Sequence, residues 1–246
     1  MNRLSGLLVV FLFSIACMRQ ADDSLRIAVA SSMAGPATEL ARAFEKAGHD
    51  RVDLSIASSG LLYHQIVSGA EYDLFLSADT IFCAKLDSIG LNSRPPMVYA
   101  TGKLAIYSSN EIDIRLDSSL LRDVRHLIIP NPKTAPYGWA ALSFLNNLGM
   151  NPETLPIVYA QNAIEAIHLL RSGAAPMAIS SLSVSRNGPS SHYNTIELPP
   201  HLYSPIHHSL LSIKREPENP MCQEFLSFLH SESGRAILVN YGFSIP

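Results

Sequence analysis

Short apolar runs of strand length alternate with helical patterns from Leu25 onward, and this alternation constrains the fold more than any other feature. The run at 25–30 precedes a helical pattern whose apolar residues lie on one face and which ends at Gly48. An apolar run at 52–57, a serine turn and a second helical pattern repeat the plan, and a third run follows at 73–78. Strands that alternate with helices are typical of an α/β fold.

The rest of the chain continues this pattern and indicates two lobes. Further strands are predicted at 98–108, 126–129, 177–180 and 207–213, with helices at 137–148 and 162–170 and two more within 217–241. The long run at 98–108 is expected to cross into a second lobe, and the run at 207–213 to return from it. A chain of 246 residues has room for two lobes. We therefore assign lobe 1 to residues 25–100 and 204–246, and lobe 2 to residues 101–203.

The N-terminal segment has the pattern of an export signal. Arg3 precedes an apolar run at 7–13, and small residues follow up to Ala16 and Cys17. We predict a signal peptide at 1–16 and a tether at 17–24, which locates the protein in the periplasm or otherwise outside the cytoplasmic membrane. Two processing routes stay open, because the residues up to Ala16 fit ordinary signal peptidase whereas Cys17 fits a lipid anchor.

Pairs of hydroxyl side chains occupy two turns in which a predicted strand leads into a helix. Ser31 and Ser32 follow the first strand, and Ser58 and Ser59 follow the second. A serine at such a turn can cap its own helix. Hydroxyls together with the free N–H groups of helix starts can also bind an oxyanion without any formal positive charge. Both interpretations stay open, and the repetition at equivalent turns favours a shared anion site.

The second half of the chain contains matching turns. Residues 130–138 precede one helix, residues 161–163 precede another, and Ser180 and Ser181 end a predicted strand. Lys133 is the cation nearest to these turns, and we expect it to be a solvated loop side chain. The formal net charge of −3 provides no basic surface for nucleic acid. An anion would therefore be held by local dipoles and hydrogen bonds.

Several of these motifs resemble the periplasmic molybdate-binding proteins of ABC importers. The motifs are 30–33 (ASSM), 56–60 (IASSG), 65–66 (QI), 69–79 (GAEYDLFLSAD) and 241–243 (YGF). The resemblance runs from about Leu25 to the C-terminus. It implies a type II periplasmic-binding-protein fold of two α/β lobes, each a doubly wound mixed sheet, with the ligand in the cleft between them. The implied ligand is molybdate or tungstate, and the implied partner is the membrane permease of an ABC importer.

The resemblance also implies a set of binding residues. By position, the family's ligand contacts fall on Ser32, Ser59, Tyr137, Ala163 and Ser181. Ser181 departs from the family, which often has a tyrosine there, and Tyr137 is a candidate to replace the missing phenol. We expect a monomer with no catalytic residue, no cofactor and no cation held by the protein.

Three other classes of function stay open as alternatives. An enzyme is disfavoured because the sequence lacks G-x-S-x-G, G-x-G-x-x-G and P-loop motifs. A zinc- or iron-binding importer component is conceivable from the histidines His192, His201, His207 and His208. However, His207 and His208 should point to opposite faces of a strand. Sulfate or phosphate is a further alternative ligand, although monoprotonated phosphate needs an acceptor and none of the candidate turn residues is acidic.

Overall fold

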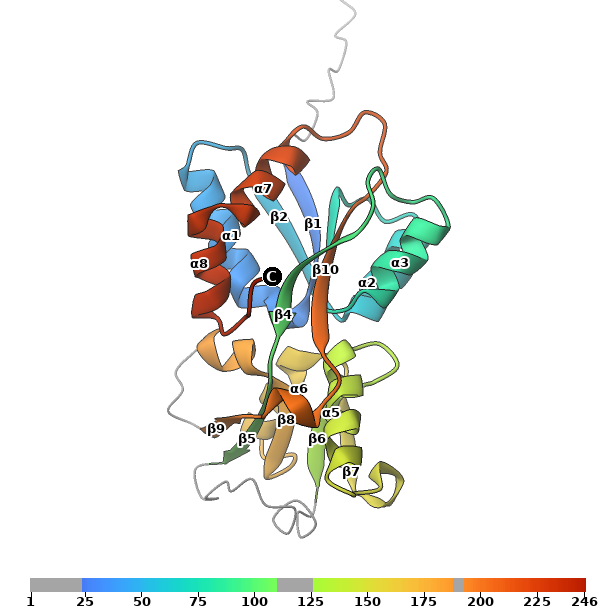
Figure 1. Ribbon diagram of the computed structural model, residues 1–246, viewed down its shortest axis with the longest axis vertical. Coiled ribbons are helices and arrows are strands. Elements are labelled where there is room, and N and C mark those ends of the chain that lie inside the picture. Colours follow the sequence, from blue (N-terminus) through green and yellow to red (C-terminus); the bar gives the residue numbers. More distant parts are fainter. Residues whose placement is uncertain (1–23, 110–125, 188–192) are drawn as a thin grey trace, which may run out of the picture.

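The structure is a computed structural model that describes residues 24–109, 126–187 and 193–246. The predicted signal peptide at 1–16 and Cys17 lie outside these residues. The described chain forms two five-stranded sheets with helices on both faces of each. Figure 1 shows the two sheets in separate lobes, one beyond the other along the long axis of the molecule. The predicted two-lobed α/β fold is confirmed.

The first lobe contains a mixed sheet with the strand order β2-β1-β3-β10-β4. Its strands are β1 (Leu25–Ala30), β2 (Val52–Ala57), β3 (Leu74–Ser77), β4 (Met97–Gly102) and β10 (Ile206–Ser212). Strands β2 and β3 run parallel to β1, whereas β10 runs antiparallel to β3 and β4. The carboxyl ends of β1, β2 and β3 therefore meet at one edge of the sheet.

Alternation of side chains along the strands decides which helices cover each face of this sheet. Leu25, Ile27 and Val29 share one buried cluster, and Ala28 belongs to another. The first cluster packs against α1 (Ala34–Lys46), α7 (Met221–His230) and α8 (Glu232–Asn240). The second packs against α2 (Ser59–Val67) and α3 (Ile81–Ser88). Both faces are covered, which explains why every residue of β1 except Arg26 is apolar.

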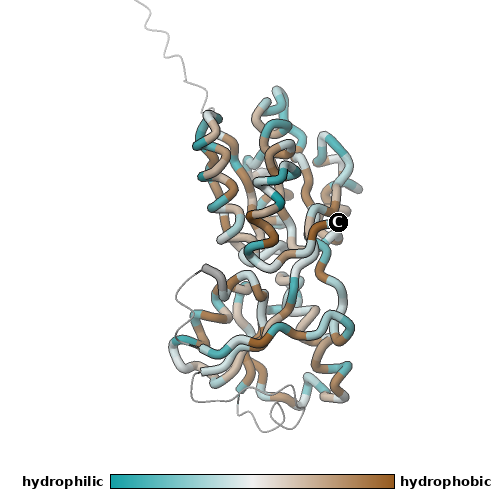
Figure 2. The backbone as a smooth tube through the Cα atoms, turned by 60° about the vertical axis from the view of Figure 1, so that its left-hand side comes forward, coloured by the Kyte–Doolittle hydropathy of each residue, from teal (hydrophilic) through white to brown (hydrophobic). Residues whose placement is uncertain are grey.

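The second lobe repeats this plan with the strand order β7-β6-β8-β5-β9. Its strands are β5 (Leu104–Ser109), β6 (Leu127–Pro130), β7 (Ile157–Ala160), β8 (Met177–Ser181) and β9 (Tyr193–Glu197). Helix α5 (Pro136–Asn147) packs on one face and α6 (Ala163–Arg171) on the other. Apolar segments occur throughout both lobes in Figure 2, in keeping with a separate core in each.

The chain changes sheets twice. The single long strand expected at 98–108 is two strands, β4 in the first sheet and β5 in the second, separated at Lys103. The break arises because one straight strand cannot pair in two differently placed sheets. The chain returns to the first sheet between β9 and β10. Within the described ranges, no helix combines the length and apolar character needed to cross a bilayer.

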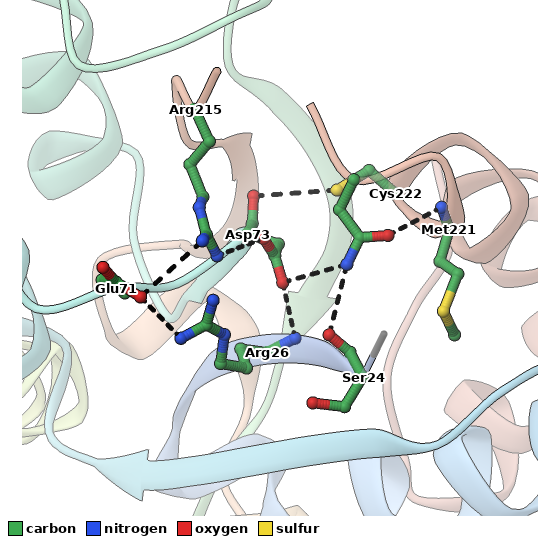
Figure 3. Close-up of polar contacts among 8 residues, drawn as sticks. Ser24, Arg26, Glu71, Asp73, Arg215, Met221 and Cys222 are labelled. Atoms are coloured by element: carbon green, nitrogen blue, oxygen red, sulfur yellow. Dashed lines mark hydrogen bonds and ion pairs between the residues drawn. The ribbon is translucent and has the colours of Figure 1, made fainter. Parts of the chain in front are cut away.

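A polar cluster ties β1, β3 and the segment after β10 together at the edge of the first sheet where β1 and β3 begin (Figure 3). The buried carboxylate of Asp73 accepts hydrogen bonds from the backbone N–H of Arg26 at 2.7 Å and the guanidinium of Arg215 at 2.7 Å. It also accepts one from the Asn219 amide at 3.3 Å. Glu71 pairs with both arginines from a mostly exposed position. Several donors thus compensate the desolvation of the Asp73 carboxylate.

Candidate functional site

A small cavity lies where strand-to-helix turns of the two lobes meet. The first lobe lines it at the ends of β1, β2 and β3, and the second lobe lines it at the starts of α5 and α6. The lining residues are Ala30, Ser31, Ser32, Ser58, Ser59, Ala78, Ala135, Pro136, Tyr137 and Ala163. Four of the five predicted site residues are therefore brought together here, and Ser181 is not among the lining residues.

The serines of the first lobe face the cavity without capping their helices. Neither the 3-10 turn at Ser31–Met33 nor α2 begins with a side-chain cap hydrogen bond, whereas Asn162 does cap α6. The capping interpretation of the two serine pairs therefore finds no support in their hydrogen bonds.

Two of these serine hydroxyls accept a backbone hydrogen bond and so keep their own proton. Ser59 Oγ accepts from the N–H of Ala78 at 3.0 Å. Ser31 Oγ accepts from the N–H of Ala163 at 3.1 Å, across the boundary between the lobes. Each hydroxyl oxygen is thereby occupied by a donor, which leaves its proton available to a ligand.

Ser32 differs from its neighbours because its hydroxyl is buried and has no hydrogen-bond partner in the described part of the chain. A buried polar group without a partner is unusual, since its desolvation is not compensated. Ser32 lies on the cavity wall, so a ligand in the cavity can supply the missing partner.

Tyr137 brings a phenol to the cavity from the second residue of α5. Its side chain is buried, and its hydroxyl lies 3.2 Å from Nε2 of His208. Burial raises the pKa of Tyr137 well above its usual range, and the nearby hydroxyls of Ser181 and Ser32 oppose that rise. The phenol is therefore protonated at neutral pH and is able to donate a hydrogen bond.

Ser181 lies behind the cavity wall in a chain of hydroxyls that sequence reasoning did not predict. Its Oγ is 2.7 Å from Oγ of Ser183, which donates to the backbone carbonyl of Ser32 at 2.5 Å. Ser183 lies in the 3-10 helix Leu182–Asn187 and follows no recognisable motif. Only the approach of the two lobes reveals its contact with Ser32.

Formal charge is absent from the cavity wall. None of its lining residues is a lysine, arginine, histidine, aspartate or glutamate. Lys133 is exposed in the loop before α5, as expected. A ligand there would meet neutral hydroxyl donors in a partly desolvated setting, where such hydrogen bonds to an anion are stronger than in water.

A larger cavity nearby suits an anion less well. It has a volume of about 340 Å³, and it is lined by Asp79, the exposed Trp139, His207 and mostly apolar neighbours. Burial raises the pKa of Asp79, while hydrogen bonds from Phe82 N–H and Ser77 oppose the rise. A carboxylate beside the cavity would repel an oxyanion, so we assign the anion to the smaller cavity.

The histidines do not form a metal centre in the described residues. His207 is exposed and His208 is buried, so the two point to opposite faces of β10, as predicted. No group of three or more histidine, cysteine, aspartate or glutamate side chains within residues 24–109, 126–187 and 193–246 is placed to hold a metal ion. His192 lies outside these residues.

Comparison with known proteins identifies the family. Residues 25–244 match the model of the family described as bacterial extracellular solute-binding protein. The chain is 30% identical to the molybdate-binding protein ModA of Azotobacter vinelandii, covering 94% of this chain and 93% of the relative. It is 31% identical to ModA of Rhodobacter capsulatus, covering 88% and 86%.

Solved structures agree with this result. The periplasmic molybdate-binding protein of Azotobacter vinelandii superposes with a TM-score of 0.82 at 29% identity, covering 90% of this chain and 99% of that one. The family model, which matches residues 25–244, spans both lobes and both crossing segments. The chain belongs to the family of bacterial extracellular solute-binding proteins.

Proposed function

We propose that this protein captures molybdate, or tungstate, outside the cytoplasmic membrane and delivers it to the permease of an ABC importer. The observation that carries the proposal is a cavity between two lobes whose wall offers hydroxyl donors and no charged side chain. Two relatives that cover most of the chain are named molybdate-binding proteins, which supports the same ligand.

The donor set favours a fully deprotonated dianion. The protons of Ser31 and Ser59 are free to donate because the oxygens of both hydroxyls already accept backbone hydrogen bonds. Tyr137 is protonated. Monoprotonated phosphate would need an acceptor, and the cavity wall contains no carboxylate. This argument separates phosphate from molybdate, tungstate and sulfate, which differ from one another mainly in size.

We propose that Ser32, Ser59 and Tyr137 hold the anion, and we add Ser31, through which Ala163 would act. The amide of Ala163 donates to Ser31, so the Ser31 hydroxyl is the donor that faces the ligand at this point of the wall. Ser181 would act from behind the wall, through its neighbours.

Membership of an extracellular solute-binding family assigns the protein to the outside of the cytoplasmic membrane. For its processing we propose removal of residues 1–16, with lipid attachment at Cys17 as the alternative to a free N-terminus. Intact mass measurement of protein from its native host distinguishes the two, and retention of Met1 would refute export through this segment. We further propose that the protein is a monomer, with lobe 1 at 25–100 and 204–246 and lobe 2 at 101–203.

Calorimetric titration tests the ligand. Purified protein, stripped of anion by partial unfolding and dialysis, should be titrated with molybdate, tungstate, sulfate and phosphate at one pH and ionic strength. We expect molybdate and tungstate to bind at least about 100-fold more tightly than sulfate or phosphate, a difference of about 2.7 kcal/mol. Tighter binding of sulfate or phosphate, or no binding of any of the four, would refute the proposal.

A further inference from the structure

The buried contact between Tyr137 and His208 joins the cavity wall to the strand that returns to the first lobe. The phenol oxygen lies 3.2 Å from Nε2 of His208, and the two rings meet edge to face with centroids 5.9 Å apart. Both side chains are buried. Gly102 lies against the pair, since an added Cβ would stand 2.1 Å from the phenol oxygen and 3.0 Å from Nε2. The space between the crossing segments is thus filled by this contact.

The surroundings of His208 decide which of its nitrogens carries the proton. Burial lowers the pKa of His208 to about 3, so the ring is neutral at physiological pH and has one N–H. Its Nδ1 is buried and has no hydrogen-bond partner among the described residues. A proton on Nδ1 would leave a buried donor unpaired, whereas a proton on Nε2 leaves only a lone pair unpaired. Because orphaned buried N–H groups are the rarer defect, the proton belongs on Nε2.

The hydroxyl protons of Ser181 and Ser183 are also accounted for by contacts that do not involve the phenol. The single proton of Ser183 is donated to the carbonyl of Ser32. Ser183 must therefore accept from Ser181 in the 2.7 Å contact between their hydroxyls. With its own proton used in this way, Ser181 has none left to donate to Tyr137. A proton on Nε2 of His208 therefore leaves the phenol proton free to point into the cavity that Tyr137 lines.

We propose that His208 is a positioning residue for the anion site: its Nε2–H donates to the Tyr137 oxygen and leaves the phenol proton to the ligand. This inference rests on the proposed function and specifies how one donor of that site is oriented. Without the imidazole N–H, the phenol would have no fixed donor on that side and its proton would lose its preferred direction. Preorganisation of this kind strengthens binding because the donor need not be reoriented when the ligand arrives.

A double-mutant cycle tests the proposal. The dissociation constant of molybdate should be measured by calorimetry for the wild type, Tyr137→Phe, His208→Leu and the double variant. We expect Tyr137→Phe to weaken binding about 10- to 100-fold and His208→Leu to weaken it about tenfold, as for loss of hydrogen bonds to a charged ligand. In the Tyr137→Phe background, His208→Leu should have little further effect, since no phenol proton remains to be oriented.

Two further variants separate positioning from packing. His208→Gln retains an N–H donor of similar reach and should recover most of the affinity that His208→Leu loses. His207→Gln, on the exposed side of the same strand, should bind molybdate like the wild type. Equal losses from His208→Leu in both backgrounds, or no recovery with His208→Gln, would overturn the proposal and assign His208 a packing role alone.

A measurement on the unmodified protein covers the case in which the variants do not fold. Long-range ¹H–¹⁵N NMR of the imidazole nitrogens reports which nitrogen of each neutral histidine carries the proton. The buried ring, which stays neutral when exposed histidines become protonated at pH 5, should carry its proton on Nε2. A proton on Nδ1 would overturn the proposal. Failure of the proposed ligand would be recognised separately, because the wild type would then not bind molybdate whatever the tautomer.

Discussion

The Ser32 hydroxyl is expected to contribute to ligand binding but not to the stability of the fold. It is buried without a partner, so in the absence of a ligand it contributes desolvation cost and no hydrogen bond. Ser59, by contrast, also accepts the N–H of Ala78 and so supports the turn after β3. The two serines look alike in the sequence, and they differ only in their surroundings.

Ser32→Ala should therefore weaken molybdate binding without destabilising the protein. Loss of one hydrogen bond to a charged ligand costs roughly 1.5–3 kcal/mol, which is about 10- to 150-fold in dissociation constant. The melting temperature of the anion-free protein should stay the same or rise. Calorimetry and thermal unfolding measure the two effects. Lys133→Ala is the control, because an exposed loop charge contributes little through water and salt. Normal binding by Ser32→Ala with loss of binding by Lys133→Ala would contradict a site of neutral donors.

Among the elements, β3 depends on a polar anchor at its start rather than on apolar packing alone. Asp73 precedes β3 and receives donors from β1 and from the segment after β10 (Figure 3). The buried carboxylate of Asp73 thus connects three separate segments of the chain: β1, β3 and the segment after β10.

Asp73→Ala should destabilise the protein by roughly 3 kcal/mol, because it leaves the Arg26 N–H and the Arg215 guanidinium without their acceptor. Unfolding in urea measures the change. Glu71→Gln is the matched control, since that side chain is 68% exposed and pairs with the same two arginines. An exposed ion pair contributes about 1 kcal/mol or less. Equal losses from the two variants would show that burial of Asp73 is not what makes its contacts important.

At the scale of the whole molecule, contacts between the two lobes hold them together around the cavity. Among the described residues, four hydrogen bonds cross the boundary there, and one joins the N–H of Gly60 to the carbonyl of Thr134 at 2.9 Å. An added Cβ on Gly60 would stand 2.9 Å from the Cα of Thr134, closer than such atoms approach. The closed arrangement therefore requires glycine at this point of α2.

Gly60→Ala should hold the lobes apart and weaken molybdate binding about tenfold or more. The stability of the anion-free protein should not fall, because alanine favours a helix over glycine by roughly 0.5–1 kcal/mol. Calorimetry gives the affinity, and small-angle scattering with and without molybdate gives the compaction. Leu61→Ala, at a half-exposed neighbouring position, should bind normally. Unchanged affinity in Gly60→Ala would mean that close contact at Thr134 is not needed to hold the anion.

Local patterns in the sequence were sufficient for most elements. Strand β1 and helix α1 could be predicted because apolar spacing follows directly from burial of both faces of a strand and one face of a helix. Strand β9 was missed because polar residues interrupt it and much of it is partly exposed. Strand β7 is a continuous apolar run, but it is only four residues long and lies partly exposed at the edge of its sheet, so it was missed as well. The long strand at 98–108 was predicted as one because nothing local marks the change of sheet at Lys103.

The sequence by itself determined the α/β alternation and the serine turns, since both depend on residues adjacent along the chain. Only the tertiary structure decided what those turns face. Tyr137 meets His208 across 71 positions, and Ser183 reaches Ser32 across 151. The direction of each hydroxyl proton depends on these distant partners, because a hydroxyl has one proton to donate and neighbours compete for it. Sequence patterns do not indicate which distant groups compete for a hydroxyl proton. The contacts of His208 and Ser183 with site residues can therefore be recognised only once the two lobes are folded against each other.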